Sequence, residues 1–169
     1  MATNKKWRSA NAKQFVVLVI FFVLCGLGLN AYYTKIAEAS LARVVFETKN
    51  GEKSPVFHLE VASRPETRVK GLMGRKVLAP DQGMLFIFPE ADDHGIWMKN
   101  TYVALDVIYI GADRKVVGVA GNLKVFSLDE HKVGEPSKYI IEINAGLAAK
   151  YGISKGAKVE FLGPLPAAL

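Results

Sequence analysis

Cysteine and histidine are scarce in this sequence of 169 residues, and their scarcity removes several kinds of chemistry. The one cysteine, Cys25, lies inside an apolar run, so residues 40–169 can form neither an internal disulfide nor a thiolate site. The three histidines, His58, His94 and His131, do not show the i, i+2 or i, i+4 spacing of metal-binding pairs on a strand or helix. We therefore expect no metal and no cofactor.

An excess of basic charge is missing from the part of the chain that is expected to fold. The net charge is +6, but residues 1–39 carry five of the bases against one acid, Glu38, which leaves 17 bases and 15 acids for residues 40–169. A nucleic-acid-binding domain needs a basic stripe to neutralise phosphates, and none is visible here. We therefore expect no nucleic-acid partner.

One long apolar run stands near the N-terminus, at residues 15–33, and four bases but no acid precede it. Its length suits a bilayer-spanning helix, and bases stay on the cytoplasmic side. Two fates remain open, an uncleaved membrane anchor or a signal peptide cut after Ala37-Glu38-Ala39. Residues 1–39 are thus a signal peptide or anchor with a tether. Residues 40–169 form a domain that is exported or held at the inner membrane, facing the periplasm.

Residues 40–169 are dominated by short β-prone segments separated by turns. The sequence predicts an all-β domain, a sandwich or a small barrel, with two short helices. Asn50-Gly51 favours a tight hairpin turn. A capping box of Ser63 and Glu66 is expected to start the first helix, and Asn144 is expected to cap the second. The strands are expected at Arg43–Thr48, Ser54–Ala62, Met84–Phe88, Gly95–Met98, Asp106–Ile110, Lys115–Ala120, Tyr139–Ile143 and Lys158–Leu162.

A series of motifs resembles a known family. They read GLMGR at 71–75, GMLFIF at 83–88, WMKNT at 97–101, Leu105-Asp106, and EINAG at 142–146. Over about residues 56–162 the sequence resembles the bacterial and archaeal domain of unknown function 192 family. The resemblance implies a small all-β fold, short helices and frequent export, but no known reaction. Many members carry cysteines where this chain has none at 121–138, so a cysteine-based role is excluded here.

The strongest candidate site combines WMKNT with polar residues farther along the chain. Its members are Trp97, Lys99, Asn100, Asp106, Glu142 and Asn144. A tryptophan ring beside such groups suits a small polar ligand or an envelope glycan, because the ring stacks and the polar groups orient. The alternative is purely structural: Trp97 lies in the core, Lys99 pairs with a carboxylate, and Asn144 only caps its helix.

Other functions compete with a binding module. Asp106 and Glu142 can serve as the acid–base pair of an envelope hydrolase if they share one cleft. The Asp92-Asp93-His94 run can hold a cation, and Met73, Met84 and Met98 can hold copper, although loop and core roles are commoner. A basic cluster between Arg68 and Lys76 can touch anionic lipid, and an apolar surface can dock a membrane protein. The absence of a recognisable catalytic set favours a non-enzymatic binding module.

Overall fold

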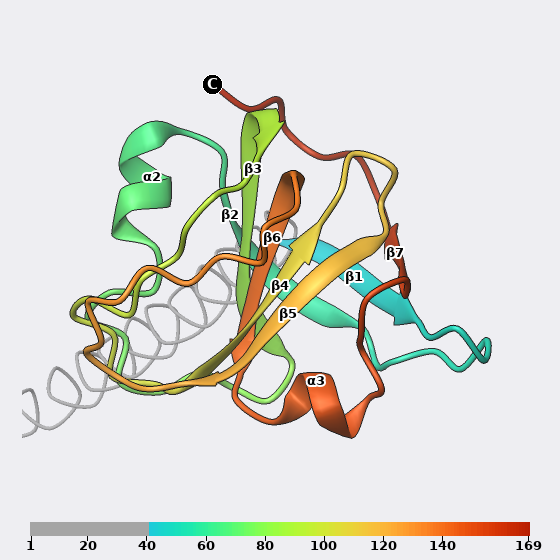
Figure 1. Ribbon diagram of the computed structural model, residues 1–169, viewed down its shortest axis with the longest axis horizontal. Coiled ribbons are helices and arrows are strands. Elements are labelled where there is room, and N and C mark those ends of the chain that lie inside the picture. The colour runs from blue at the N-terminus through green and yellow to red at the C-terminus, as the bar shows by residue number, and fades with distance from the viewer. Residues whose placement is uncertain (1–40) are drawn as a thin grey trace, which may run out of the picture. The chain divides into compact units, whose positions relative to one another are not determined.

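A computed structural model describes residues 41–169, and their backbone follows one strongly curled sheet (Figure 1). Residues 41–169 form seven strands and two short helices, one helix between β2 and β3 and the other between β6 and β7. The strands are β1 (Ala42–Glu47), β2 (Phe57–Ala62), β3 (Gln82–Asp92), β4 (Leu105–Ile110), β5 (Val116–Leu123), β6 (Ser137–Asn144) and β7 (Lys158–Phe161). The helices are α2 (Pro65–Lys70) and α3 (Leu147–Lys150).

The predicted membrane segment lies outside the described residues, because it falls within residues 1–40. Within residues 41–169, no helix is long and apolar enough to cross a bilayer.

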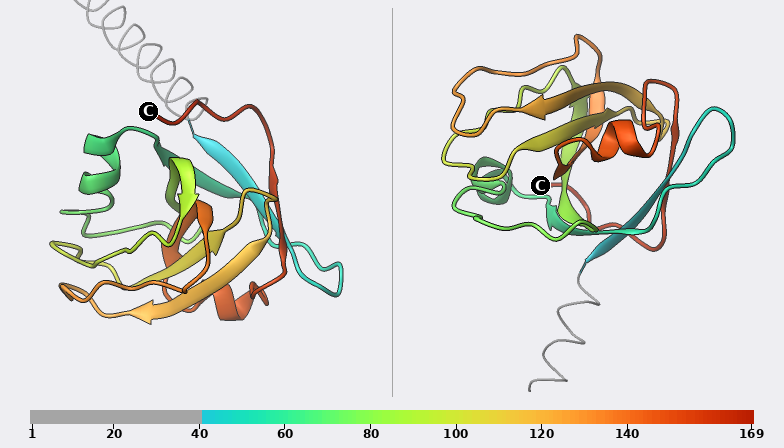
Figure 2. Two further views of the ribbon diagram at one scale, coloured as in Figure 1. Left: turned by 45° about the horizontal axis from the view of Figure 1, so that its top comes forward. Right: turned by 90° about the horizontal axis from the view of Figure 1, so that it is seen from below.

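The strands form a single sheet in the order β5-β4-β6-β3-β2-β1-β7. Every neighbouring pair is antiparallel except β2 and β3, which are parallel and joined through α2. The two edges of the sheet come together at the bridge between Lys115 and Lys158, so the sheet curls into a half-barrel (Figure 2). The domain is therefore mostly β with two short helices, as predicted. Because the seven strands form one curled sheet and not two packed sheets, the sandwich alternative is wrong and the barrel-like alternative is nearer to the structure.

The sheet buries apolar side chains on both faces. The inner cluster fills the curl and contains alternate residues of β4 and β6, such as Ile108 and Ile141, together with Phe46, Phe57 and Ala148 of α3. The outer cluster contains the other residues of these strands and is covered by the chain around α2. Its members include Leu72, Phe86, Met98, Leu105, Val107, Tyr109 and Ile140. Because adjacent strand residues point to opposite faces, neighbours in β4 and β6 belong to different clusters.

Several local predictions are corrected. Residues 95–98 form no strand, since only Ile96 makes a bridge, to His131. The N-cap of α2 is Arg64, whose backbone N–H is accepted by the Thr67 hydroxyl, so the predicted Ser63 and Glu66 box is wrong. The β1–β2 hairpin is confirmed, and Gly51 has the positive φ of +82° that its turn needs.

Candidate functional site

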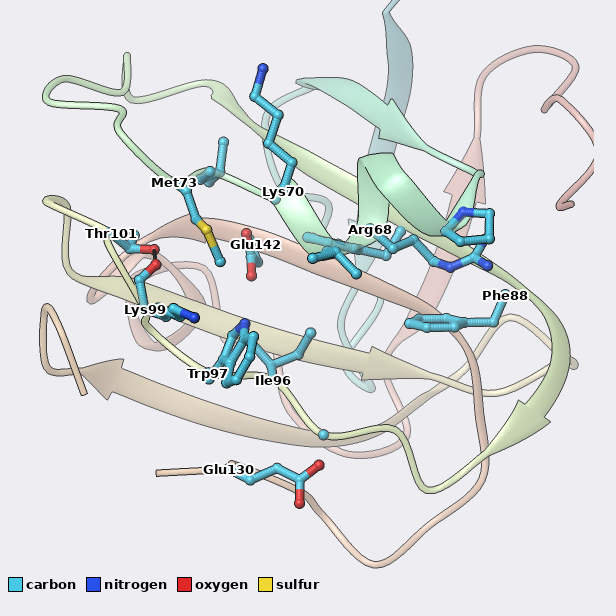
Figure 3. A pocket seen from close by; sticks show the side chains of 16 residues that line it. Arg68, Lys70, Met73, Phe88, Ile96, Trp97, Lys99, Thr101, Glu130 and Glu142 are labelled. Carbon is cyan, nitrogen blue, oxygen red and sulfur yellow. Dashed lines mark hydrogen bonds between the residues drawn. The ribbon is translucent and has the colours of Figure 1, made fainter. Parts of the chain in front are cut away.

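A cavity of about 600 Å³ opens on the outer face of the sheet (Figure 3). Its walls come from α2 and the residues after it, from β3, from residues 95–101, and from Glu142 of β6. This volume lies within the range of ligand pockets, about 300–1,000 Å³. We call it the Trp97 pocket.

Trp97 and Lys99 point into this pocket because their neighbours are tied down. Ile96 pairs with His131 through two backbone hydrogen bonds, and the Met98 N–H donates to the Ser127 carbonyl at 3.0 Å. Ile96 and Met98 are buried in the outer cluster. Trp97 and Lys99, which alternate with these buried residues, therefore face away from the outer cluster and into the pocket. Trp97 is 45% exposed, which rules out the prediction that it is a core residue.

The Lys99 ammonium lies over the Trp97 ring, 5.1 Å from the ring centroid. This is a cation–π contact, not an ion pair with Asp106 or Glu142, so that structural alternative is wrong. Thr101, which also lines the pocket, donates its hydroxyl to the Lys99 carbonyl at 3.1 Å. Both contacts restrain the lysine at the pocket wall.

Asn100 has a backbone role outside the pocket lining. Its φ is +52°, a left-handed conformation that asparagine tolerates better than most residues. Its carbonyl accepts the Gly74 N–H at 2.8 Å. Asn100 therefore turns the chain after Lys99 and fastens it to the residues that follow α2.

Glu142 is a buried acid on the wall of the pocket. It is only 4% exposed, and its Oε2 atom has no hydrogen-bond partner. In the sheet it stands between Met84 of β3 and Val107 of β4, which offer no polar group. Burial therefore raises the pKa of Glu142 to about 8, so that the carboxyl group keeps its proton at neutral pH.

Gly83 allows β3 to approach β6 at this point. A Cβ atom on residue 83 would lie 2.1 Å from the Glu142 carbonyl oxygen, a distance that no real side chain occupies. The GMLFIF motif thus begins with the residue that lets the strand carrying Glu142 pack closely.

Asp106 lies on the opposite face of the sheet. Its two carboxylate oxygens accept the N–H groups of Asn122 and Ala148, each at 2.8 Å. Asp106 pairs in register with Ile143, whereas Glu142 pairs with Val107, so the two acids point to different faces. The predicted acid–base pair is therefore contradicted. Asp106 instead holds the start of α3 against the end of β5.

Asn144 also serves the framework. Its side-chain amide donates to the carbonyls of Leu78 and Ala79 at 3.1 and 3.0 Å. The N-cap of α3 is Gly146, so the predicted capping role of Asn144 is wrong. Of the six predicted site residues, the structure brings Trp97, Lys99 and Glu142 together at one pocket.

Comparison with known proteins places this architecture in a family. The sequence model of the family described as an uncharacterised ACR, DUF192, matches residues 45–161, most of the chain. The chain belongs to this family. The resemblance predicted from the motifs is thereby confirmed.

Two solved structures resemble this DUF192 domain. One, from Sinorhizobium meliloti 1021, is described as a proposed transcription regulator; it is 35% identical, with 73% of this chain and 95% of that chain covered and a TM-score of 0.69. The other, from Novosphingobium aromaticivorans DSM 12444, is a protein of unknown function; it is 35% identical, with 71% and 84% covered and a TM-score of 0.64. None of the curated proteins compared with the chain matches it.

Sequence reasoning missed several residues of the Trp97 pocket, above all Arg68 of α2. Its guanidinium donates to the carbonyls of Ser63, Ile87 and Leu169 and lies 5.3 Å from the centroid of Phe88. Arg68 and Lys70 appeared in the sequence only as part of a basic cluster. The basic cluster was visible in the sequence, but nothing there indicated that β3 and Trp97 face this helix.

The candidate metal residues have other roles. Among residues 41–169 no group of three histidine, cysteine or acidic side chains is placed to hold an ion. The His94 ring stacks on the Phe88 ring with 3.6 Å between the ring centroids. The Asp93 carboxylate accepts a hydrogen bond from the Gly134 N–H. Met84 and Met98 are buried in the outer cluster, whereas Met73 lines the pocket.

Proposed function

We propose that this DUF192 domain is a non-enzymatic binding module that takes a small polar ligand, such as a fragment of an envelope glycan, in the Trp97 pocket. We further propose that residues 1–39 place the domain on the far side of the inner membrane, as an anchored or exported protein. The second proposal rests on the apolar run and its preceding bases.

One observation carries the binding function: Glu142 is a buried acid with an unpartnered oxygen at the wall of a cavity. Buried polar groups in folded proteins are nearly always hydrogen-bonded, because an unmet one costs about 1–3 kcal/mol. A ligand that enters the cavity can supply the missing partner. The unpaired oxygen is thus a feature that a binding site explains and a purely structural role does not.

The geometry gives less support to hydrolysis. Two-carboxylate hydrolases need both acids in one cleft, roughly 5–9.5 Å apart. Asp106 is on the other face of the sheet, and the other acid of the pocket lining, Glu130, pairs with Lys132 at 3.5 Å. Glu142 is left without a second free carboxylate in the lining.

A ligand screen with matched variants tests the binding function. The full chain is screened against small acids, amines, nucleotides and short glycans by calorimetry and ligand-observed NMR. We expect at least one class to bind the wild type and to lose at least tenfold in affinity in Trp97→Ala. Lys99→Met is expected to weaken binding, whereas Lys150→Met, which removes a similar contact with Tyr151 (5.2 Å), leaves it unchanged. A screen without any ligand, or equal binding by Trp97→Ala, would count against the pocket.

Docking onto another membrane protein is the third hypothesis from the sequence, after the binding module and the hydrolase. Tyr102 and Phe126 are half exposed and pack edge to face, 4.9 Å between centroids, and Leu128 is exposed nearby in the chain. Crosslinking at residue 126 in whole cells tests it. Fractionation of the same cells tests the location, and full-length chain found only in the cytosol would refute it.

A further inference from the structure

We propose that the ligand of the Trp97 pocket is a small carboxylate with an apolar body, and that the Glu142 carboxyl group receives it as a hydrogen-bond donor. This inference rests on the binding function proposed above and deepens it. It names the charge of the ligand, its shape and the direction of one hydrogen bond.

The pocket lining carries more basic than acidic side chains. Arg68, Lys70 and Lys99 line the cavity. The Arg68 guanidinium donates to three backbone oxygens, whereas neither Lys70 nor Lys99 belongs to any of the ion pairs among residues 41–169. The exposed acid of the lining, Glu130, is paired with Lys132. Unpaired cations around a cleft raise the local concentration of anions and repel cations. The charge of the cavity wall therefore favours an anionic ligand.

Two aromatic rings of the pocket lining, Trp97 and Phe88, already lie against basic side chains of the chain itself. An organic cation would gain most from lying over an aromatic ring. The Lys99 ammonium lies over Trp97, and the Arg68 guanidinium and the His94 ring both lie against Phe88. A second cation at either ring would be repelled by the positive charge already held there.

Glu142 is faced by groups from the sheet and from the segments that cover the cavity. On the sheet, β4 contributes Tyr109, whose hydroxyl donates to the His131 carbonyl at 2.6 Å and so has no proton to offer. Across the cavity, α2 contributes Arg68 and Lys70, residues 95–101 contribute Lys99, and the loop after β5 contributes Glu130. Figure 3 shows the Glu142 carboxyl group among these side chains, between Met73 and Trp97 in that view.

No cation pairs with Glu142, and burial holds its pKa at about 8. At pH 7 the group is therefore an O–H donor as well as an acceptor. A ligand carboxylate offers only acceptors, which matches a donor at the cavity wall and the lysines of the same lining. The remaining walls, such as Ile96, Met73 and Phe86, suit an aryl ring or a short alkyl chain.

The test uses sets of three compounds that share one apolar body: phenylacetate, phenylacetamide and phenethylamine, and hexanoate, hexanamide and hexylamine. The chain has two tryptophans, Trp7 and Trp97, so Trp7→Phe leaves Trp97 as the only indole that reports on binding. We expect an acid to bind at least tenfold more tightly than the amine of its set at pH 7. Its affinity is expected to fall about tenfold between pH 7 and pH 9, as Glu142 loses its proton.

Glu142→Gln separates this inference from a general electrostatic effect. Glutamine keeps a neutral donor, so the affinity of the variant for the acid at pH 7 should lie within about threefold of that of the wild type. Between pH 7 and pH 9 this affinity should change by less than about twofold. Glu130→Gln is the matched control, an exposed acid of the same lining, and should keep the pH dependence of the wild type.

Tighter binding of the amine, or loss of acid binding in Glu142→Gln, would overturn the inference and leave the binding function standing. The same holds if the broad screen finds ligands but no carboxylate binds. If neither the screen nor the matched sets yield a ligand, the proposed function itself fails.

Discussion

The two faces of the curled sheet each bury one acid, and the two acids have opposite surroundings. On the inner face, Asp106 is 2% exposed and accepts two backbone N–H groups at 2.8 Å. On the outer face, Glu142 is 4% exposed and has an oxygen without a partner. Both are equally removed from water, so burial alone does not separate them.

The difference separates a closed face of the sheet from a face that holds a cavity. The inner face is closed by α3, and every group that Asp106 meets belongs to the framework. The outer face is covered only in part, by α2 and the segments after it, which leaves the Trp97 pocket. An unpaired buried acid costs stability, and the binding function proposed above gives the unpaired oxygen of Glu142 a partner.

The largest expected effect lies on the inner face. Asp106→Ala leaves the N–H groups of Asn122 and Ala148 without an acceptor and should lower the free energy of unfolding by about 4 kcal/mol, since each bond to a charged group contributes about 1.5–3 kcal/mol. Urea denaturation at pH 7 measures it. Asp113→Ala, in an exposed turn, is the control and should cost less than about 1 kcal/mol. An equally small loss in both variants would show that Asp106 does not hold α3.

The next effect lies on the outer face and has the opposite sign. In the unfolded chain Glu142 loses its proton near pH 4.3, whereas in the folded chain it keeps the proton up to about pH 8. Wild-type stability should therefore fall as pH rises between these values, by at most about 1.4 kcal/mol per unit.

Glu142→Gln removes this titration. Relative to the wild type, the variant should gain about 3 kcal/mol of stability between pH 4.5 and pH 7, again measured by urea denaturation. Parallel pH curves for the two proteins would mean that Glu142 is solvated or paired, and the contrast with Asp106 would disappear.

A smaller effect is expected at Asn144, which supports the outer face without lining the pocket. Asn144→Ala removes two hydrogen bonds to the carbonyls of Leu78 and Ala79 and should cost about 1–2 kcal/mol in thermal unfolding. Asn144→Asp should lower the stability further, because it sets carboxylate oxygens against the carbonyl oxygens of Leu78 and Ala79. Faster hydrogen exchange in residues 78–82 should accompany either change.

The smallest effect on stability is expected at Trp97. Because its side chain is half exposed, Trp97→Ala should change the free energy of unfolding by about 1 kcal/mol or less. Ile141→Ala, in the inner cluster, should cost about 2–5 kcal/mol. A loss at Trp97 as large as that at Ile141 would restore the core interpretation and remove the main wall of the pocket.

Much of the fold could be predicted from local patterns. The strands around Phe57–Ala62 and Leu105–Ile110 alternate or run apolar between turn residues, and their positions were predicted to within a few residues. The exception is residues 95–98, where WMKNT looks like a strand. Only Ile96 finds a bridge there, since the facing chain at His131 is itself a loop.

The candidate site could be predicted only in part. WMKNT singled out Trp97 and Lys99 because a ring and a polar group together suit a ligand, and both residues line the Trp97 pocket. Asp106 and Glu142 looked equivalent, since both follow apolar residues in strands. Arg68 could not be assigned to the site, because α2 reaches the pocket only through the parallel crossover between β2 and β3.

The amino-acid sequence by itself determined the family, the β-rich fold and the two short helices, because these depend on local patterns and on motifs a few residues long. It also singled out three residues that line one cavity, Trp97, Lys99 and Glu142. Tertiary structure alone decided which of the two acids, Asp106 or Glu142, lines the cavity. Strand register places Asp106 opposite Ile143 and Glu142 opposite Val107, and since side chains alternate across a sheet, that pairing sends one carboxyl group into the closed face and the other to the pocket.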